Sequence, residues 1–398
     1  MFRKERFYPV SETKWDPKQA LQAIEEILKN TAQSFQREKG VWPGHPQDDF
    51  VVDHSLYTGT TGIIWAMEYL KKNTSIESRF DSKSTLERAL SELPEQMKNS
   101  DHPDNAAYLI GKLPALMMLN QLSHSEERAK EIEDEIEVNH TQPVRELMWG
   151  TAGTMLAANL MYQTTKEDRW KKQFCFQAER LLEEWEEIPD AGYLWSPELY
   201  GDNRKYLSPV HGLVGNLIPL IKGKEHLSNE KYQEVCTKAM ETIVKLAFSN
   251  EKHANWQATY HKDYSHLPPA NLQYCHGGPG IVVHLSELPK GQNAEFDLLM
   301  EKGGELVWDA GASKKGSNLC HGTGGSGYTF LKLFQRTQDE MWLDRARTFA
   351  MHSIEQFQRA EKFFQQQRYS LWTGDPGLAV YLENCINAKA DFPTIDVF

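Results

Sequence analysis

The 398-residue sequence is poor in cysteine and contains no long apolar run. Its five cysteines follow no regular spacing, which argues against a disulfide framework and for a reducing compartment. No stretch of about 18 apolar residues occurs, as a membrane-spanning helix would need, and the N-terminal MFRKERFYPV lacks the apolar segment of a signal peptide. These absences predict a soluble, cytoplasmic protein with no membrane span.

Basic residues are also in the minority, with 44 Lys and Arg against 56 Asp and Glu, for a formal net charge of −12. Such a charge disfavours non-specific binding to nucleic acid or to anionic membranes, so an anionic substrate would need a local basic patch. Long β-branched strands and linkers rich in Pro, Gly and Ser are missing as well. We therefore expect one domain over residues 1–398, without a parallel sheet.

Glycine, in contrast, recurs in a fixed pattern. A G-x-x-G step followed by an apolar run appears at Gly59/Gly62, Gly150/Gly153, Gly212/Gly215, Gly277/Gly280, Gly322/Gly325 and Gly374/Gly377. Random placement would give about two such steps, so the pattern indicates an internal repeat in which glycine precedes a buried helix. Residues 109–119 form a candidate degenerate copy, with Gly111 and with Pro114 in place of the second glycine. The sequence thus predicts seven repeats.

Charged amphipathic segments alternate with these apolar runs. They lie at residues 17–36, 166–187, 229–249 and 339–357, and their apolar residues show the i, i+3, i+4 spacing of a one-sided helix. A pair of one apolar and one amphipathic helix buries its apolar face only against neighbouring pairs. Seven inner and seven outer helices closing into a ring satisfy this condition and would gather the glycine loops at one end, around the centre.

Two of the glycine steps begin with the same triplet, Cys275-His276-Gly277 and Cys320-His321-Gly322. Thiolate and imidazole together suit Zn²⁺ better than Mg²⁺ or Ca²⁺, and ligands 45 residues apart, brought together by the fold, are typical of a catalytic zinc with three protein ligands and one open position. The alternative is a pair of buried cysteines beside helix-capping histidines. The other three cysteines are expected to be inert core residues: Cys175, Cys236 and Cys385.

These features resemble the LanC-like proteins, relatives of the lanthionine cyclases. The resemblance rests on the glycine steps, on YCHG at 274–277, on LCHG at 319–322, on HG at 211–212 and on SLWTG at 370–374. It implies an all-α fold, an α/α toroid, with Zn²⁺ held by Cys275, Cys320 and His321 and one position left for a substrate thiol. His276 would then be a substrate-side neighbour of the metal and no ligand.

The same resemblance implies two catalytic residues. His211 stands where the family has an active-site histidine, and Glu146 stands where it has an acidic residue. From the residues alone, His211 could also be a helix-end partner, and Glu146 could be a first-turn carboxylate favoured by the helix dipole. Bacterial cyclases commonly have an arginine four residues before the first zinc cysteine, where this chain has Asn271.

Several features are more similar to the branch that adds glutathione to dehydroalanine or dehydrobutyrine in proteins. Lys315 matches a lysine five residues before the second cysteine of that branch, RFYP at 6–9 resembles its early arginine segment, and DFP at 391–393 resembles its ending. By this resemblance, Lys315 and Arg6 would bind the carboxylates of glutathione. Arg368 lies, in sequence, a few residues from the position of a further arginine of that branch. Each of the three is alternatively a solvated surface residue.

The sequence and this resemblance thus predict a zinc-dependent enzyme that joins a thiol, with glutathione as the expected one, to a dehydroamino acid. His211 would be the acid that protonates the enolate, and Glu146 would orient it. Three alternatives remain open at this point. They are a lanthionine-forming peptide cyclase, a protein that binds glutathione or a kinase without turnover, and a glycosidase with Glu146 and Asp375 as its carboxylates.

Overall fold

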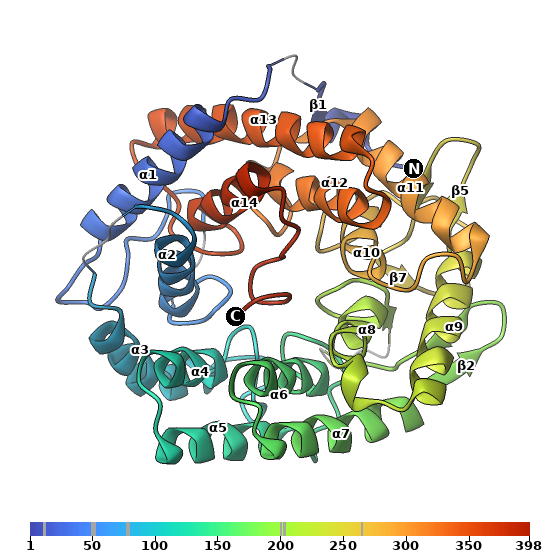
Figure 1. Cartoon of the computed structure of the whole chain (residues 1–398), viewed down its shortest axis with the longest axis horizontal. Helices are drawn as coiled ribbons and strands as arrows, with labels where there is room; N and C mark the ends of the chain where they lie inside the picture. Colours follow the sequence, from blue (N-terminus) through green and yellow to red (C-terminus); the bar gives the residue numbers. More distant parts are fainter. Residues whose placement is uncertain (11–12, 49–52, 77–79, 200, 202–203, 264–265) are drawn as a thin grey trace.

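The computed structural model describes residues 1–10, 13–48, 53–76, 80–199, 201, 204–263 and 266–398. In these residues fourteen α-helices form two concentric rings, with odd-numbered helices outside and even-numbered helices inside (Figure 1). The inner ring comprises α2 (Thr60–Asn73), α4 (Leu113–Leu122), α6 (Thr151–Thr165), α8 (Leu213–Lys222), α10 (Gly278–Leu285), α12 (Thr323–Thr337) and α14 (Asp375–Asn387). The structure confirms the predicted α/α toroid.

The outer ring is amphipathic and is somewhat less regular than predicted. It comprises α1 (Pro17–Gln33), α3 (Ser82–Met97), α5 (Glu126–Val138), α7 (Asp168–Glu183), α9 (Asn229–Lys245), α11 (Ala294–Ala310) and α13 (Glu340–Phe364). Three predicted segments ran too far, at 17–36, 166–187 and 229–249, and α13 runs seven residues beyond the predicted end at 357. Buried residues follow one face, as at Ala20, Ala23, Ile24 and Ile27 of α1.

The structure also contains short antiparallel strand pairs and two 3₁₀ turns, which the sequence did not predict. The pairs are β1 (Phe7–Tyr8) with β8 (Ala312–Ser313), β2 (Glu186–Ile188) with β3 (Gly192–Leu194), β4 (Lys205–Tyr206) with β7 (Thr259–Tyr260), and β5 (Phe248–Ser249) with β6 (Ala254–Asn255); the turns are η1 (Lys4–Arg6) and η2 (Lys224–His226). The overlong predictions at 166–187 and 229–249 included residues of β2 and β5. The β1–β8 pair fastens the N-terminal segment beside Lys315.

Glycine stands at the start of the inner helices because the loop before each of these helices packs closely against the first turn of the helix. The first glycine of every step caps its helix, and α4 follows Lys112 instead. At the second glycine, a side chain would meet the carbonyl oxygen of the residue six positions earlier. Only glycine permits this close approach between loop and helix.

Gly325 gives a direct test of this packing. A Cβ at this position would overlap the carbonyl oxygen of Leu319, which immediately precedes Cys320. We expect Gly325→Ala to lower the free energy of unfolding by about 1–3 kcal/mol, the usual cost of overpacking. Thermal unfolding monitored by circular dichroism measures the loss. Gly291→Asn, in an exposed turn with open space around it, is the control.

Backbone hydrogen bonds join neighbouring loops around the centre. In most of these bonds both partners lie two positions before the first glycine of their loop, or before Gly111 in the α4 loop, and in one bond the donor is Leu147, the neighbour of such a residue. We call the residues at this position the linking residues; they are Tyr57, Leu109, Met148, Val210, Cys275, Cys320 and Trp372. The bonds run from Tyr57 N to Leu109 O, Leu109 N to Met148 O, Leu147 N to Val210 O, Cys275 N to Cys320 O, Cys320 N to Trp372 O and Trp372 N to Tyr57 O, at 2.8–3.3 Å. Equivalent positions of successive loops therefore lie side by side.

The C-terminal segment after α14 turns back toward the middle of the ring (Figure 1). Phe392 stacks on Tyr274, the residue directly before Cys275 in the chain, with ring centroids 4.3 Å apart. Further along, the buried Asp396 carboxylate pairs with Lys222 and Lys332 of the inner helices, at 2.6 and 2.7 Å. The segment thus supports the loop that carries the first Cys-His-Gly triplet.

Candidate functional site

Two thiols meet at the centre of the ring. Cys275 and Cys320 are the linking residues of successive loops, and the backbone N–H of Cys275 donates to the Cys320 carbonyl at 3.0 Å. A hydrogen bond between the two sulfur groups lowers the pKa of Cys275 and raises that of Cys320 well above its usual value.

Each sulfur also receives a polar partner from outside the triplets. The Tyr57 hydroxyl lies 2.8 Å from Cys320 Sγ, and the Gln273 amide lies 2.9 Å from Cys275 Sγ. Sequence reasoning missed both residues. Tyr57 could have been found from the glycine register, because it is the linking residue of its loop just as Cys320 is of its own. Gln273 carried no comparable signal.

His211 and Glu146 form a hydrogen-bonded pair, although 65 residues separate them in sequence. Glu146 is fully buried, and its carboxylate accepts the backbone N–H groups of Met148, at 2.9 Å, and Trp149. It also faces His211 Nδ1 at 2.9 Å. Because an ionised carboxylate only accepts, Nδ1 is the protonated nitrogen of this pair. Glu146 is therefore not a helix first-turn residue, since α6 begins at Thr151.

The two histidines of the triplets are partly buried and uncharged at neutral pH. Burial, aided by nearby positive charge, lowers the pKa of His276 and of His321 to about 4. Among the described residues, His276 Nδ1 is buried without a hydrogen-bond partner. An unprotonated ring nitrogen of this kind can accept a hydrogen bond or bind a metal ion.

The ligand types in this cluster suit zinc, but their arrangement supplies only part of a zinc site. Two thiols and neutral imidazoles are the ligands that zinc prefers. Within the described part of the chain, however, no three His, Cys, Asp or Glu side chains stand in a group that would hold a metal ion. The structure brings Cys275 and Cys320 together, and His321, predicted as the third ligand, lines an adjacent pocket.

That adjacent pocket is basic and has a volume of about 440 Å³. Its cationic lining comes from Lys314, Lys315, Arg359 and Arg368, with His321 beside them. Arg368 lies in an ion pair with Asp48, its Nε 3.0 Å from the carboxylate. Lys314 and Arg359 both lie over the ring of Tyr8, at 5.1 and 5.8 Å. Sequence reasoning identified Lys315 and Arg368 but missed Lys314 and Arg359, which occur in ordinary charged stretches.

Arg6 approaches the same region from the N-terminal segment. Its guanidinium donates to the Asn271 side chain at 3.4 Å, and its carbonyl accepts the backbone N–H of Lys314 at 2.9 Å. A guanidinium from the N-terminal segment therefore contacts Asn271, the residue four positions before Cys275. The strand pair β1–β8 holds it there.

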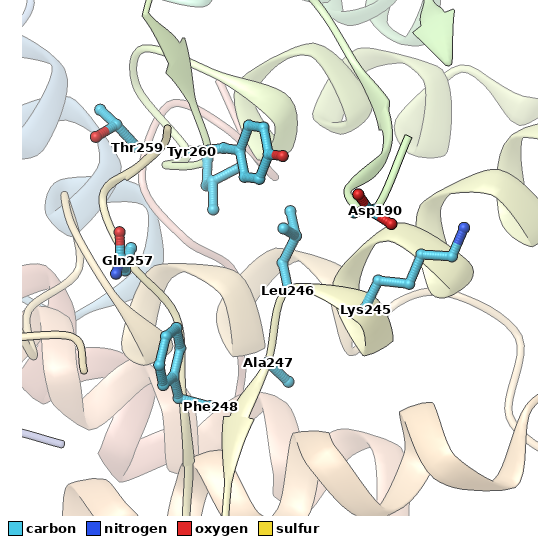
Figure 2. A pocket seen from close by; sticks show the side chains of 9 residues that line it. Asp190, Lys245, Leu246, Ala247, Phe248, Gln257, Thr259 and Tyr260 are labelled. Atoms are coloured by element: carbon cyan, nitrogen blue, oxygen red, sulfur yellow. The ribbon is translucent and has the colours of Figure 1, made fainter. Parts of the chain in front are cut away.

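The remaining predicted residues lie outside this cluster. Asp375 is fully enclosed at the start of α14 and accepts the backbone N–H of Arg368 at 2.7 Å, and burial raises its pKa to about 7. Cys236 and Cys385 are buried, as expected of core residues, but Cys175 is only half-buried. A separate pocket of about 210 Å³, shown in Figure 2, is lined by Asp190, Lys245, Phe248 and Tyr260 among others and by none of the predicted site residues.

The described residues include no helix that is long and apolar enough to cross a membrane.

Comparison with known proteins identifies a family. The family model described as lanthionine synthetase C-like protein matches residues 11–397. Glutathione S-transferase LANCL1 of Danio rerio is 25% identical over 265 residues, and LanC-like protein GCL1 of Arabidopsis thaliana is 33% identical over 85 residues. These alignments cover 63% and 20% of this chain and only 62% and 19% of those two relatives.

Among solved structures, nisin cyclase has a similar fold. Its TM-score is 0.61 at 15% sequence identity, and the match covers 94% of this chain and 99% of the cyclase. At this identity the likeness concerns the toroid and not the chemistry.

Proposed function

The chain belongs to the lanthionine synthetase C-like family, and from this premise we propose that it adds glutathione to dehydroalanine or dehydrobutyrine residues of a protein or peptide, in a zinc-dependent reaction. The observation that carries the proposal is the thiol pair of Cys275 and Cys320 next to a basic pocket. The zebrafish relative, named a glutathione S-transferase, supports the same choice of thiol.

Zinc would be held by Cys275, Cys320 and His321. His321 follows Cys320 directly in the chain and its ring is neutral at pH 7, as a ligand must be. When bound, zinc would supply a Lewis acid that binds the substrate sulfur and ionises it near neutral pH. The chain's own residues supply everything else that the reaction needs.

Binding of glutathione is assigned to the basic pocket. Glutathione carries two carboxylates, and the pocket presents Lys314, Lys315, Arg359 and Arg368 in a volume within the usual range of about 300–1,000 Å³ for small-molecule sites. Cations are suited to this task by charge-assisted hydrogen bonds. The pocket thus provides the local basic patch that an overall acidic protein needs for an anionic substrate.

Proton transfer is assigned to His211. Addition of a thiol across the C=C bond joins sulfur to the β-carbon and hydrogen to the α-carbon, so nothing is oxidised or reduced. The Glu146 carboxylate accepts from Nδ1 and would stabilise the protonated ring, and Nε2–H is the group that we propose protonates the enolate. Glu146 acts through His211 and is a positioning residue.

Removal of one pocket cation tests the choice of thiol. We expect Lys315→Ala to raise the KM for glutathione by about 10-fold, a loss of about 1.4 kcal/mol of binding, because one carboxylate loses its cation. The KM for 2-mercaptoethanol, which has no carboxylate, should stay within about twofold. Steady-state kinetics with both thiols on a dehydroalanine peptide measure the difference.

The matched control is Lys290→Ala, which removes an exposed lysine that does not line the pocket. It should leave both KM values unchanged. An equal rise in KM for the two thiols after Lys315→Ala would show that Lys315 does not select glutathione, and a peptide cyclase that uses a thiol of its own substrate would then be the better proposal.

A further inference from the structure

The Gln273 side chain bridges a cation and a thiol. Its Oε1 accepts from Lys315 Nζ at 2.9 Å, and its Nε2 lies 2.9 Å from Cys275 Sγ. An ammonium group can only donate, so the amide atom that faces Lys315 must be the oxygen. The NH₂ group is thereby turned toward the sulfur, and the direction of the amide is decided by chemistry.

The backbone around Gln273 holds this arrangement in place. Gln273 and His276 exchange two backbone hydrogen bonds, each 3.1 Å long, which close a tight turn over Tyr274 and Cys275. Tyr274 between them is fully buried, with its hydroxyl 2.7 Å from His284 Nε2. With Tyr274 anchored in the core, the side chains of Gln273 and Cys275 meet on the opposite, polar side of this turn.

The second thiol has a partner of a different kind. Cys320 Sγ meets the neutral Tyr57 hydroxyl, and among the described residues no lysine or arginine is hydrogen-bonded to that hydroxyl. At Cys275, the donor is an amide whose oxygen is itself bound to an ammonium. Such a chain polarises the amide and strengthens its N–H as a donor. The two sulfurs are therefore held unequally, and Cys275 has the stronger support.

We propose that Gln273 is a positioning residue that fixes the Cys275 sulfur for metal binding and connects it to the charge of Lys315. The inference rests on the proposed function, because it assumes that Cys275 is a zinc ligand. It gives Lys315 a second role besides carboxylate binding. Groups that hydrogen-bond to metal ligands typically contribute about 10–100-fold to metal affinity or activity.

The test is the zinc dissociation constant of the intact protein, measured by competition with a chromophoric chelator, which needs neither glutathione nor an acceptor. Gln273→Leu preserves the approximate volume and removes the hydrogen bonds, so we expect the dissociation constant to rise by about 10–100-fold. Gln273→Glu should bind zinc less tightly than wild type as well, because it replaces the N–H donor with a carboxylate oxygen against the sulfur. Gln292→Leu, at an exposed glutamine elsewhere, should match wild type.

Kinetics provide a second readout. In Gln273→Leu, kcat should fall by a similar factor for glutathione and for 2-mercaptoethanol, while the ratio of their KM values stays as in wild type. Dissociation constants within twofold of wild type for both Leu and Glu variants would overturn the inference. If wild type binds zinc but adds no thiol to dehydroalanine, the proposed function fails, whereas the effect of Gln273 on zinc binding would still decide the inference.

Discussion

Cys320→Ala is expected to reduce thiol addition by about 10³-fold or more and to leave the protein folded but poor in zinc. Without zinc, a free substrate thiol with a pKa near 8.5 is only about 3% ionised at pH 7. The lost ionisation of the substrate thiol alone therefore lowers the rate by roughly 30-fold. Misplacement of the reacting groups costs about another 10²-fold or more. Elemental analysis measures the loss of zinc, and turnover on a dehydroalanine peptide measures the loss of thiol addition.

The control is Cys236→Ala, which removes a buried thiol on α9 away from the glycine loops. Its zinc content and turnover should be those of wild type. Full zinc occupancy in Cys320→Ala would contradict the ligand assignment, even if turnover were lost.

His211→Asn should slow thiol addition by about 10²–10⁴-fold without loss of zinc, since it removes a proton donor and no ligand. Glu146→Gln should have a smaller effect of the same kind, because the amide still lies beside Nδ1 but no longer stabilises the charged ring. Single-turnover kinetics report the chemical step, and metal analysis of the same samples reports the ligands.

A second His–carboxylate pair in the chain offers a matched control. His253 Nε2 lies 2.8 Å from Oδ2 of Asp309, which belongs to the outer helix α11. His253→Asn should leave turnover unchanged. Unchanged turnover in His211→Asn, in contrast, would remove this residue from the reaction.

The glycine steps predicted the fold well because they reflect a constraint that repeats. At the second glycine of each step the loop carbonyl leaves no room for a side chain, so the sequence records every turn into an inner helix. The degenerate copy at 109–119 became α4, where Pro114 occupies an early helical position that needs no N–H donor. The strand pairs escaped prediction because two or three residues show no periodicity.

The part of the candidate site that depends on the register of the glycine loops could be predicted from the sequence. The part that depends on how distant segments pack and on where their side chains point could not. Cys275 and Cys320 are equivalent residues of adjacent loops, so their meeting followed from the repeat. The same register would have placed Tyr57 beside them. The basic pocket draws instead on Arg359 of α13 and on the N-terminal strand, whose approach depends on tertiary packing.

The most direct test of the central claim is intact-mass spectrometry of a dehydroalanine peptide incubated with the purified, zinc-analysed protein, with and without glutathione. We predict about one zinc per chain and a peptide whose mass rises by one glutathione only when both protein and glutathione are present. A zinc-loaded protein that leaves this peptide unmodified, and that instead closes a thioether ring in a peptide carrying its own cysteine without any free thiol, would contradict the account.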